Sequence, residues 1–276
     1  MVSGRLLKAT LACVLAGGAL AAGPAAAQGL GYKYWGEISA YRPSISAKAN
    51  VSQPGLPGAD IDMEDDLGLN KHEGLLDVVL GARVFDRWLL VGEFFSLDRN
   101  GSRTIERDLA FDGVTYPASA SIDSKLRSDV YRLSVGYNFV QTPTAELGVT
   151  LGLHATDFTV ELEGNARVGG ATTQRQARAK EFLAPLPTVG LVGAYEVAPR
   201  VILSGRADYM SLKVGEYDGK LLNAQAAIGY KVTDGIEIGA AYRYVDYGLD
   251  VEKTTYTARL AYEFSGPSIY LRAGFR

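Results

Sequence analysis

Cysteine is almost absent from this sequence: the 276 residues contain one, Cys13. It lies within a predicted secretion signal, residues 1–27, so the mature chain, residues 28–276, has no cysteine. A disulfide framework is therefore excluded for the mature protein. We expect 28–276 to form a single domain.

The predicted signal peptide has the three usual parts. Arg5 and Lys8 give a positive start, an apolar stretch rich in alanine and glycine follows, and Ala25 and Ala27 form a small-x-small cleavage pattern. This arrangement is typical of a secretion signal that is cleaved directly after the last alanine.

Long apolar runs are also missing. After residue 27 no run of 18 apolar residues occurs, which excludes a transmembrane helix. An excess of basic residues is missing too: the mature chain has 26 Lys and Arg against 31 Asp and Glu, a net charge of about −5. This balance excludes a nucleic-acid-binding surface as the main feature of the protein.

Alternation of apolar and polar residues is the dominant pattern. In 146–158 one face carries Leu147, Val149, Leu151, Leu153 and Ala155, with polar residues and glycine between them. The segments 130–139 and 201–209 repeat it. Period-two alternation predicts β-strands with one apolar face. Together with 16 tyrosines and 32 glycines, it predicts an all-β, antiparallel, up-and-down transmembrane barrel.

Short and long connections alternate along the chain, as in barrels with tight periplasmic turns and longer outside loops. The predicted outside loops are 43–72, 98–121 and 164–179. We predict ten strands, with eight or twelve as alternatives, near 31–42, 73–85, 88–97, 122–140, 145–162, 180–197, 200–215, 220–232, 236–249 and 254–275.

The last of these segments reverses its pattern. Apolar residues are even-numbered from Tyr256 to Phe264 but odd-numbered from Ile269 to Phe275. A β-bulge near Ser265–Pro267 would reverse the faces. A turn between two short strands would do the same and would change the strand count.

Several stretches resemble small outer-membrane barrels of the group around outer membrane protein A and outer membrane protein W. They are 31–36 (GYKYWG), 66–69 (DLGL), 131–139 (YRLSVGYNF), 151–154 (LGLH) and 266–275 (GPSIYLRAGF). The resemblance covers the mature chain and implies the fold and a location in the cell outer membrane of a Gram-negative bacterium. It also implies that Phe275 is the terminal aromatic assembly signal read by the barrel insertion machinery, although Arg276 follows it.

The alternation places many charges on the inward face. Small barrels are narrow and largely filled by side chains, so we expect these charges to pair and close the lumen. A narrow polar pore is the alternative. The predicted lumen charge network comprises Arg83, Glu93, Arg132, Arg206, Asp208, Glu237 and Arg243.

Candidates for chemistry are few. His154 is predicted to face the lumen, and His72 to lie at the outer edge near an acidic stretch, 60–66. We interpret both as structural, because no nucleophile motif stands near them and the acidic stretch lacks the pattern of a calcium loop. The omptin proteases use an aspartate pair facing a His-Asp pair at the outer rim. Here His72 is the only histidine near that rim, and Asp98, Asp108 and Asp112 lie in the next long loop. We predict no catalytic residues, metal or cofactor.

Basic residues in the outside loops suggest contact with lipopolysaccharide phosphates, since arginine binds phosphate well. The residues proposed for this contact are Arg175, Arg178 and Lys180. Aromatic residues at strand ends fit interfacial belts. These are Trp35, Trp88, Phe139, Tyr195 and Phe275 on the periplasmic side and Tyr131, Tyr209 and Tyr244 on the outer side.

We therefore expect a non-catalytic outer-membrane barrel that anchors surface loops. The alternatives are a narrow channel for small solutes and, as a second alternative, an outer-membrane enzyme. The expected partners are outer-membrane lipids, lipopolysaccharide and the barrel insertion machinery, with no nucleic acid; the oligomeric state stays open.

Overall fold

The computed structural model describes the chain from residue 31 to residue 275, apart from 54–55, 107, 112–113, 169–170, 183–185 and 253–256. The predicted signal peptide, 1–27, lies outside the described residues. In the described part of the chain, no helix has the length and apolar character needed to cross a membrane.

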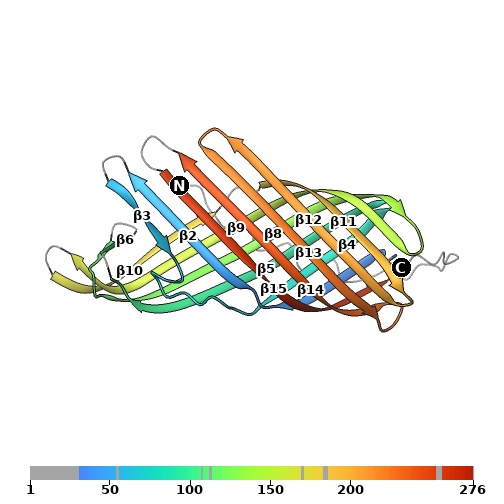
Figure 1. The fold of residues 1–276 in the computed structure, drawn as a ribbon, viewed down its shortest axis with the longest axis horizontal. Coiled ribbons are helices and arrows are strands. Elements are labelled where there is room, and N and C mark those ends of the chain that lie inside the picture. Colours follow the sequence, from blue (N-terminus) through green and yellow to red (C-terminus); the bar gives the residue numbers. More distant parts are fainter. Residues whose placement is uncertain are drawn as a thin grey trace, which may run out of the picture.

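Ten long antiparallel strands close into a barrel (Figure 1), which confirms the predicted fold class and strand number. Closure comes from the pairing of β1 with β15, in which Tyr34 lies opposite Phe275. Their bounds are β1 Tyr34–Tyr41, β4 Leu75–Phe85, β5 Trp88–Thr104, β8 Ser121–Gln141, β9 Ala145–Val168, β11 Leu186–Ala198, β12 Val201–Val214, β13 Tyr217–Lys231, β14 Ile236–Glu252 and β15 Thr257–Phe275.

The predicted outside loops are largely strand. β2 (Ser44–Gln53) continues β1 along β15 in the same register, and β3 (Leu56–Asp62) pairs with β2. β10 (Ala171–Phe182) forms a hairpin with the outer part of β9, and β6 (Leu109–Phe111) pairs with β7 (Val114–Tyr116). The barrel wall therefore extends well past the turns predicted from the sequence.

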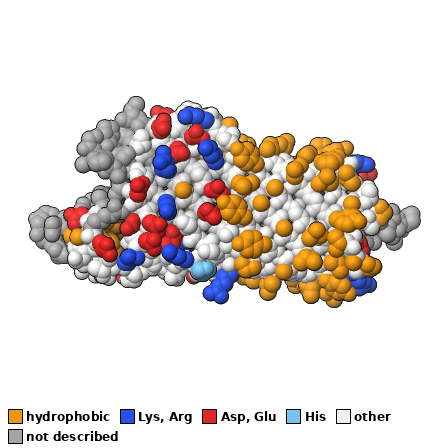
Figure 2. Space-filling view, viewed as in Figure 1, with side chains coloured by type: hydrophobic (Ala, Val, Ile, Leu, Met, Phe, Trp, Pro, Cys, Tyr) orange, Lys and Arg blue, Asp and Glu red, His pale blue; other side chains and the backbone are white. Residues whose placement is uncertain are grey.

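The periplasmic half of the wall is apolar outside. On the face seen in Figure 2, hydrophobic side chains cover much of this half, and charged side chains gather on the other half. On β8 the outward apolar face runs from Tyr131 to Phe139. A β-strand crosses a membrane with about 9–11 residues, so this face has the required length. This belt is the lipid-facing surface.

The outer half has the opposite polarity. Along β8 the even-numbered side chains face inward throughout. In the outer half they are the apolar Ile122, Leu126 and Val130 and two small serines, whereas the membrane half has Arg132. The outward residues above the belt are polar, among them Lys125. The outer half is therefore organised like a water-soluble protein, with an apolar interior and a polar surface.

The same change of surroundings explains the reversed pattern of β15. The expected bulge or turn near Ser265 is absent: β15 pairs with β14 in one unbroken register from Thr257 to Ala273. Tyr262 and Phe264 face the apolar interior of the outer half, whereas Ile269 and Leu271 face lipid. Each side chain of β15 thus keeps the direction set by its parity. What changes along the strand is the surroundings: a polar lumen inside and lipid outside in the membrane half, and an apolar interior inside and water outside in the outer half.

The aromatic residues at the rims lie as predicted, with one correction. Among those expected at the periplasmic side, Trp88, Phe139, Tyr195 and Phe275 are exposed on the lipid-facing surface. Trp35 instead points into the lumen, where its indole lies over Gly81 of β4. The inward position follows from β1 parity: Tyr34 faces lipid, so its neighbour must face the interior.

Candidate functional site: the filled lumen

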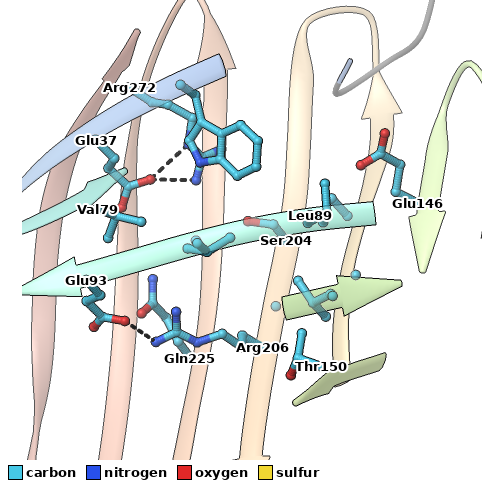
Figure 3. A pocket seen from close by; sticks show the side chains of 18 of the residues that line it. Glu37, Val79, Leu89, Glu93, Glu146, Thr150, Ser204, Arg206, Gln225 and Arg272 are labelled. Carbon is cyan, nitrogen blue, oxygen red and sulfur yellow. Dashed lines mark hydrogen bonds and ion pairs between the residues drawn. The ribbon is translucent and has the colours of Figure 1, made fainter. Parts of the chain in front are cut away.

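Glu93 of β5 is the centre of a buried charge network. Its Oε1 lies 2.7 Å from Nη1 of Arg243, and its Oε2 lies 3.0 Å from both Nη1 of Arg132 and Nη2 of Arg206. Figure 3 shows the contact with Arg206 as a dashed line across the lumen. One carboxylate thus joins arginines from three other strands: β8, β12 and β14.

Two aspartates balance the arginines. Oδ2 of Asp208 lies 3.1 Å from Arg132 and 3.2 Å from Arg206, and Oδ2 of Asp77 lies 3.3 Å from Arg243. Three arginines therefore meet three carboxylates, so the network carries no net formal charge. Charges taken out of water need this compensation, because an unpaired buried charge is strongly unfavourable.

Two smaller clusters lie nearer the periplasmic rim. Arg272 contacts Glu37 at 2.6 Å and Glu237 at 3.1 Å, and the Tyr270 hydroxyl donates a hydrogen bond of 2.7 Å to Glu237. Arg83 pairs with Glu146 at 2.8 Å. The structure thus brings five of the seven predicted lumen charges into the central network and places Glu237 and Arg83 in these separate clusters.

An apolar layer fills the lumen on the outer side of the network. Phe95, Leu126, Tyr247 and Phe264 pack there with side chains from most of the wall strands. The segment 105–120, which includes the β6–β7 hairpin, adds to this layer, and the Tyr116 hydroxyl donates a hydrogen bond of 2.9 Å to the Leu162 carbonyl of β9. Two successive layers therefore fill the lumen along its axis: the charge network and, on its outer side, the layer of apolar side chains.

A buried ion pair that sequence reasoning missed anchors this apolar layer. Arg99 of β5, expected on a loop surface, points inward, pairs with Glu64 and donates to the Asn70 carbonyl at 2.8 Å. Glu64 also accepts a hydrogen bond of 3.0 Å from the Ala47 amide of β2. These contacts hold the segment 63–72 against β2 and β5. At this position the segment fills the gap between the two strands and completes the barrel wall. Recognising β5 as a strand to residue 104 would have shown that Arg99 faces inward.

The tyrosine hydroxyl beside this pair stays protonated. Burial raises the pKa of Tyr262 to about 12, against the opposing effect of the nearby Arg99 guanidinium. The phenol is therefore neutral across the physiological range and suits the apolar layer.

The two histidines lie in different parts of the barrel. His154 is buried next to the network, and its Nε2 lies 3.3 Å from the Thr156 hydroxyl. His72 is exposed and forms an isolated β-bridge with Ser44. In the described part of the chain neither histidine pairs with a carboxylate, and no three His, Cys, Asp or Glu side chains gather as metal ligands.

The remaining predicted residues lie at the two ends of the barrel. Arg175, Arg178 and Lys180 belong to β10 at the outer end, but their side chains fall outside the described set. Phe275 ends β15 on the lipid-facing surface, with its ring centre 6.1 Å from that of Tyr34.

Comparison with known proteins gives likeness of structure only. No family model and no curated protein sequence matches the chain. The outer membrane protease OmpT of Escherichia coli superposes with a TM-score of 0.59 at 14% identity, covering 88% of this chain and 96% of that one. The toluene transporter TodX of Pseudomonas putida gives a TM-score of 0.40 at 10% identity, covering 88% and 90%. The attachment invasion protein Ail of Yersinia pestis gives 0.29 at 10%, covering 86% and 97%.

The closed barrel and its lipid-facing belt define the class. This chain is an outer-membrane β-barrel protein, located in the cell outer membrane. Within that class its fold is similar to that of OmpT. At 14% identity the likeness concerns the fold and not the activity.

Proposed function

We propose that this protein is a non-catalytic barrel that seals its own lumen and holds a rigid polar platform above the outer membrane. The supporting observation is the double filling of the lumen, in which the network around Glu93 and the apolar layer around Phe264 lie in series. A solute would have to displace both.

The platform consists of wall strands rather than flexible loops. β8 is 21 residues long, and β9 is 24 residues long. Each strand is therefore about twice as long as a membrane crossing requires. The outward side chains above the belt are polar, such as Asp98 and Arg127, which pair at 3.7 Å. Such a surface suits contact with the polar region of lipopolysaccharide and the medium.

Planar-bilayer recording of the refolded protein tests the sealed lumen. We expect no discrete conductance steps from the wild type. Arg206→Ala should also be silent, because the apolar layer still blocks the axis. Arg127→Ala, which removes an exposed arginine outside the barrel, is the matched control. Reproducible steps in the wild type that grow in Arg206→Ala and not in Arg127→Ala would overturn the sealed barrel and support a narrow channel.

The channel is the second candidate because of one observation. A cavity of about 200 Å³ lies on the periplasmic side of the network and leaves part of the lumen unfilled. Combining Arg206→Ala with Phe264→Ala weakens both fillings, and conductance appearing only in that double variant would locate the seal in these two layers.

The absence of catalysis is proposed from the histidine surroundings, and the likeness to a protease makes it worth testing. The full chain, refolded with lipopolysaccharide, should not cleave a fluorogenic peptide library above the rate of a His72→Ala variant. Cleavage that His72→Ala abolishes would replace the present proposal with an enzymatic one.

Contact with lipopolysaccharide is proposed for β10. The triple variant Arg175→Ala, Arg178→Ala and Lys180→Ala should carry less co-purified lipopolysaccharide than the wild type, since arginine and lysine neutralise phosphate. Arg87→Ala, at a periplasmic turn, should carry the wild-type amount. Equal amounts in all three proteins would remove β10 from the contact surface.

A further inference from the structure

The cavity below the charge network is built from two kinds of wall. Charged and bulky side chains come from β1, β4 and β5, whereas β11, β12 and β13 contribute mostly small or polar side chains, including Ser204 and Gln225, together with Arg206. Figure 3 shows Ser204, Gln225, Arg206 and Thr150 around this common space. Because the outer lumen is filled, the approach to the cavity is from the periplasm.

Polar atoms in this cavity are available for a ligand. Within the described residues, the side chains of Gln225 and Ser204 make no hydrogen bond, although both line the cavity. The side chains of Arg206 and Arg272 are 17% and 20% exposed, whereas that of Glu93 is 2% exposed. The side chains of Arg206 and Arg272 are therefore more accessible to solvent than the Glu93 carboxylate.

An aromatic surface borders the same space. The Trp35 indole covers Gly81 so closely that a Cβ there would lie 2.0 Å from two ring carbons. The indole is thus held against the backbone of β4, and Trp35 also lines the cavity. The electron-rich face of an aromatic ring attracts polarised C–H groups.

The charges around the cavity are balanced. The lining includes four carboxylates and four guanidiniums: Glu37, Asp77, Glu93 and Glu146 against Arg83, Arg132, Arg206 and Arg272. Each already has an ion-pair partner, so a charged ligand would enter without compensation. A neutral ligand with many hydroxyls avoids this difficulty, because hydroxyls both donate to carboxylates and accept from guanidiniums.

We propose that this cavity is a periplasm-facing binding site for a small neutral carbohydrate. The sugar ring would lie against the Trp35 indole, and its hydroxyls would bond to Gln225, Ser204 and the partly exposed side chains of Arg206 and Arg272. The cavity volume is about 200 Å³. Pockets that hold drug-sized ligands are larger, so the size favours a ligand of one sugar ring. Binding there requires no passage through the barrel.

The position of the two tryptophans allows a direct test. Trp88 faces lipid, so Trp88→Phe leaves Trp35 in the lumen as the single tryptophan of the chain. The refolded Trp88→Phe protein is titrated with glucose and with N-acetylglucosamine while tryptophan fluorescence is recorded. Glucosamine and glucuronate, which carry opposite charges, are titrated in parallel.

A saturable fluorescence change with at least one neutral sugar, at least tenfold tighter than with either charged sugar, is the expected result. Ser204→Leu should weaken binding at least tenfold by filling the cavity. Ala207→Leu, which adds the same side chain to the lipid-facing side of β12, should leave it unchanged. If Ser204→Leu does not fold, Gln225→Leu is the substitute, with the same expected loss.

Three outcomes would overturn the site. These are the absence of saturation with both neutral sugars, tighter binding of a charged sugar, and equal binding by the Ser204→Leu or Gln225→Leu protein and the Ala207→Leu control. Each is read by fluorescence alone and does not depend on conductance, so the sealed lumen and the sugar site can fail separately.

Discussion

Glu93 is the residue on which the lumen charges depend most. It contacts Arg132, Arg206 and Arg243, so its removal leaves three arginines with only Asp77 and Asp208. A buried pair adds little to stability compared with an apolar alternative, but loss of one partner exposes the other charge to a poorly solvating interior.

Glu93→Ala should therefore lower the free energy of unfolding by about 3–5 kcal/mol, the usual cost of breaking a buried pair. Urea unfolding in detergent micelles, followed by the heat-modifiable shift in electrophoretic mobility, measures it. Asp98→Ala removes an exposed carboxylate further along β5. That change should alter stability by less than about 1 kcal/mol. Similar midpoints for the two variants would show that the network is not energetically coupled.

Arg99 and Glu64 make a second buried pair, in the outer half. We expect Arg99→Ala and Glu64→Ala each to destabilise the protein, and the double variant to cost less than the sum of the two. The coupling should lie within the range of about 0.5–3 kcal/mol seen for residues in contact. A double-mutant cycle in urea gives the value, and strict additivity would refute a direct contribution of the pair.

At the scale of the element, β8 carries two surfaces of opposite polarity on one face. Its outward side chains are apolar at Leu133 in the membrane half and charged at Arg127 in the outer half. The outward side of one continuous strand thus faces lipid in the membrane half and water in the outer half. The same passage accounts for the reversed pattern of β15.

This arrangement predicts an unequal response to substitution on one face of β8. Val135→Arg should destabilise the barrel by about 2–4 kcal/mol, the cost of arginine at the middle of the lipid-facing surface of a barrel. Arg127→Leu should be nearly neutral, because that position lies in water. Unfolding in lipid vesicles compares the two. Equal effects would mean that the belt does not end between these positions.

At the scale of the whole molecule, the belt and the platform fix its orientation. The hairpin turns near Thr142 and Asp234 lie at the periplasmic rim, and the long ends of β8 and β9 lie at the outer side. Because the mature chain is predicted to lack cysteine, single cysteines can be introduced as clean reporters of the two sides.

Lys125→Cys should react with a membrane-impermeant maleimide on intact cells, since its side chain is exposed above the belt. Thr142→Cys should react only after the outer membrane is permeabilised. Labelling is quantified by the mass shift on a gel. The reverse order of reactivity would invert the orientation, and with it the periplasmic location of the cavity.

The pattern of apolar and polar residues is sufficient to predict the wall of this barrel. Alternation in segments such as 130–139 and 201–209 located the strands, because a strand between two media must alternate. It also led to the ten-strand count and the inward direction of charges such as Glu93 and Arg206, since parity alone decides which side of a strand a residue faces.

What fills the lumen depends on contacts between strands that are far apart in the sequence. Parity places Glu93 and Arg99 on the same inward face of β5, but it does not say that one meets a charge network and the other an apolar layer. Partners come from β8, β12, β14 and the segment 63–72, which are distant along the chain. The reversal of polarity in β15 misled sequence reasoning for the same reason: the medium on each side of a strand is set by the assembled barrel and not by the strand.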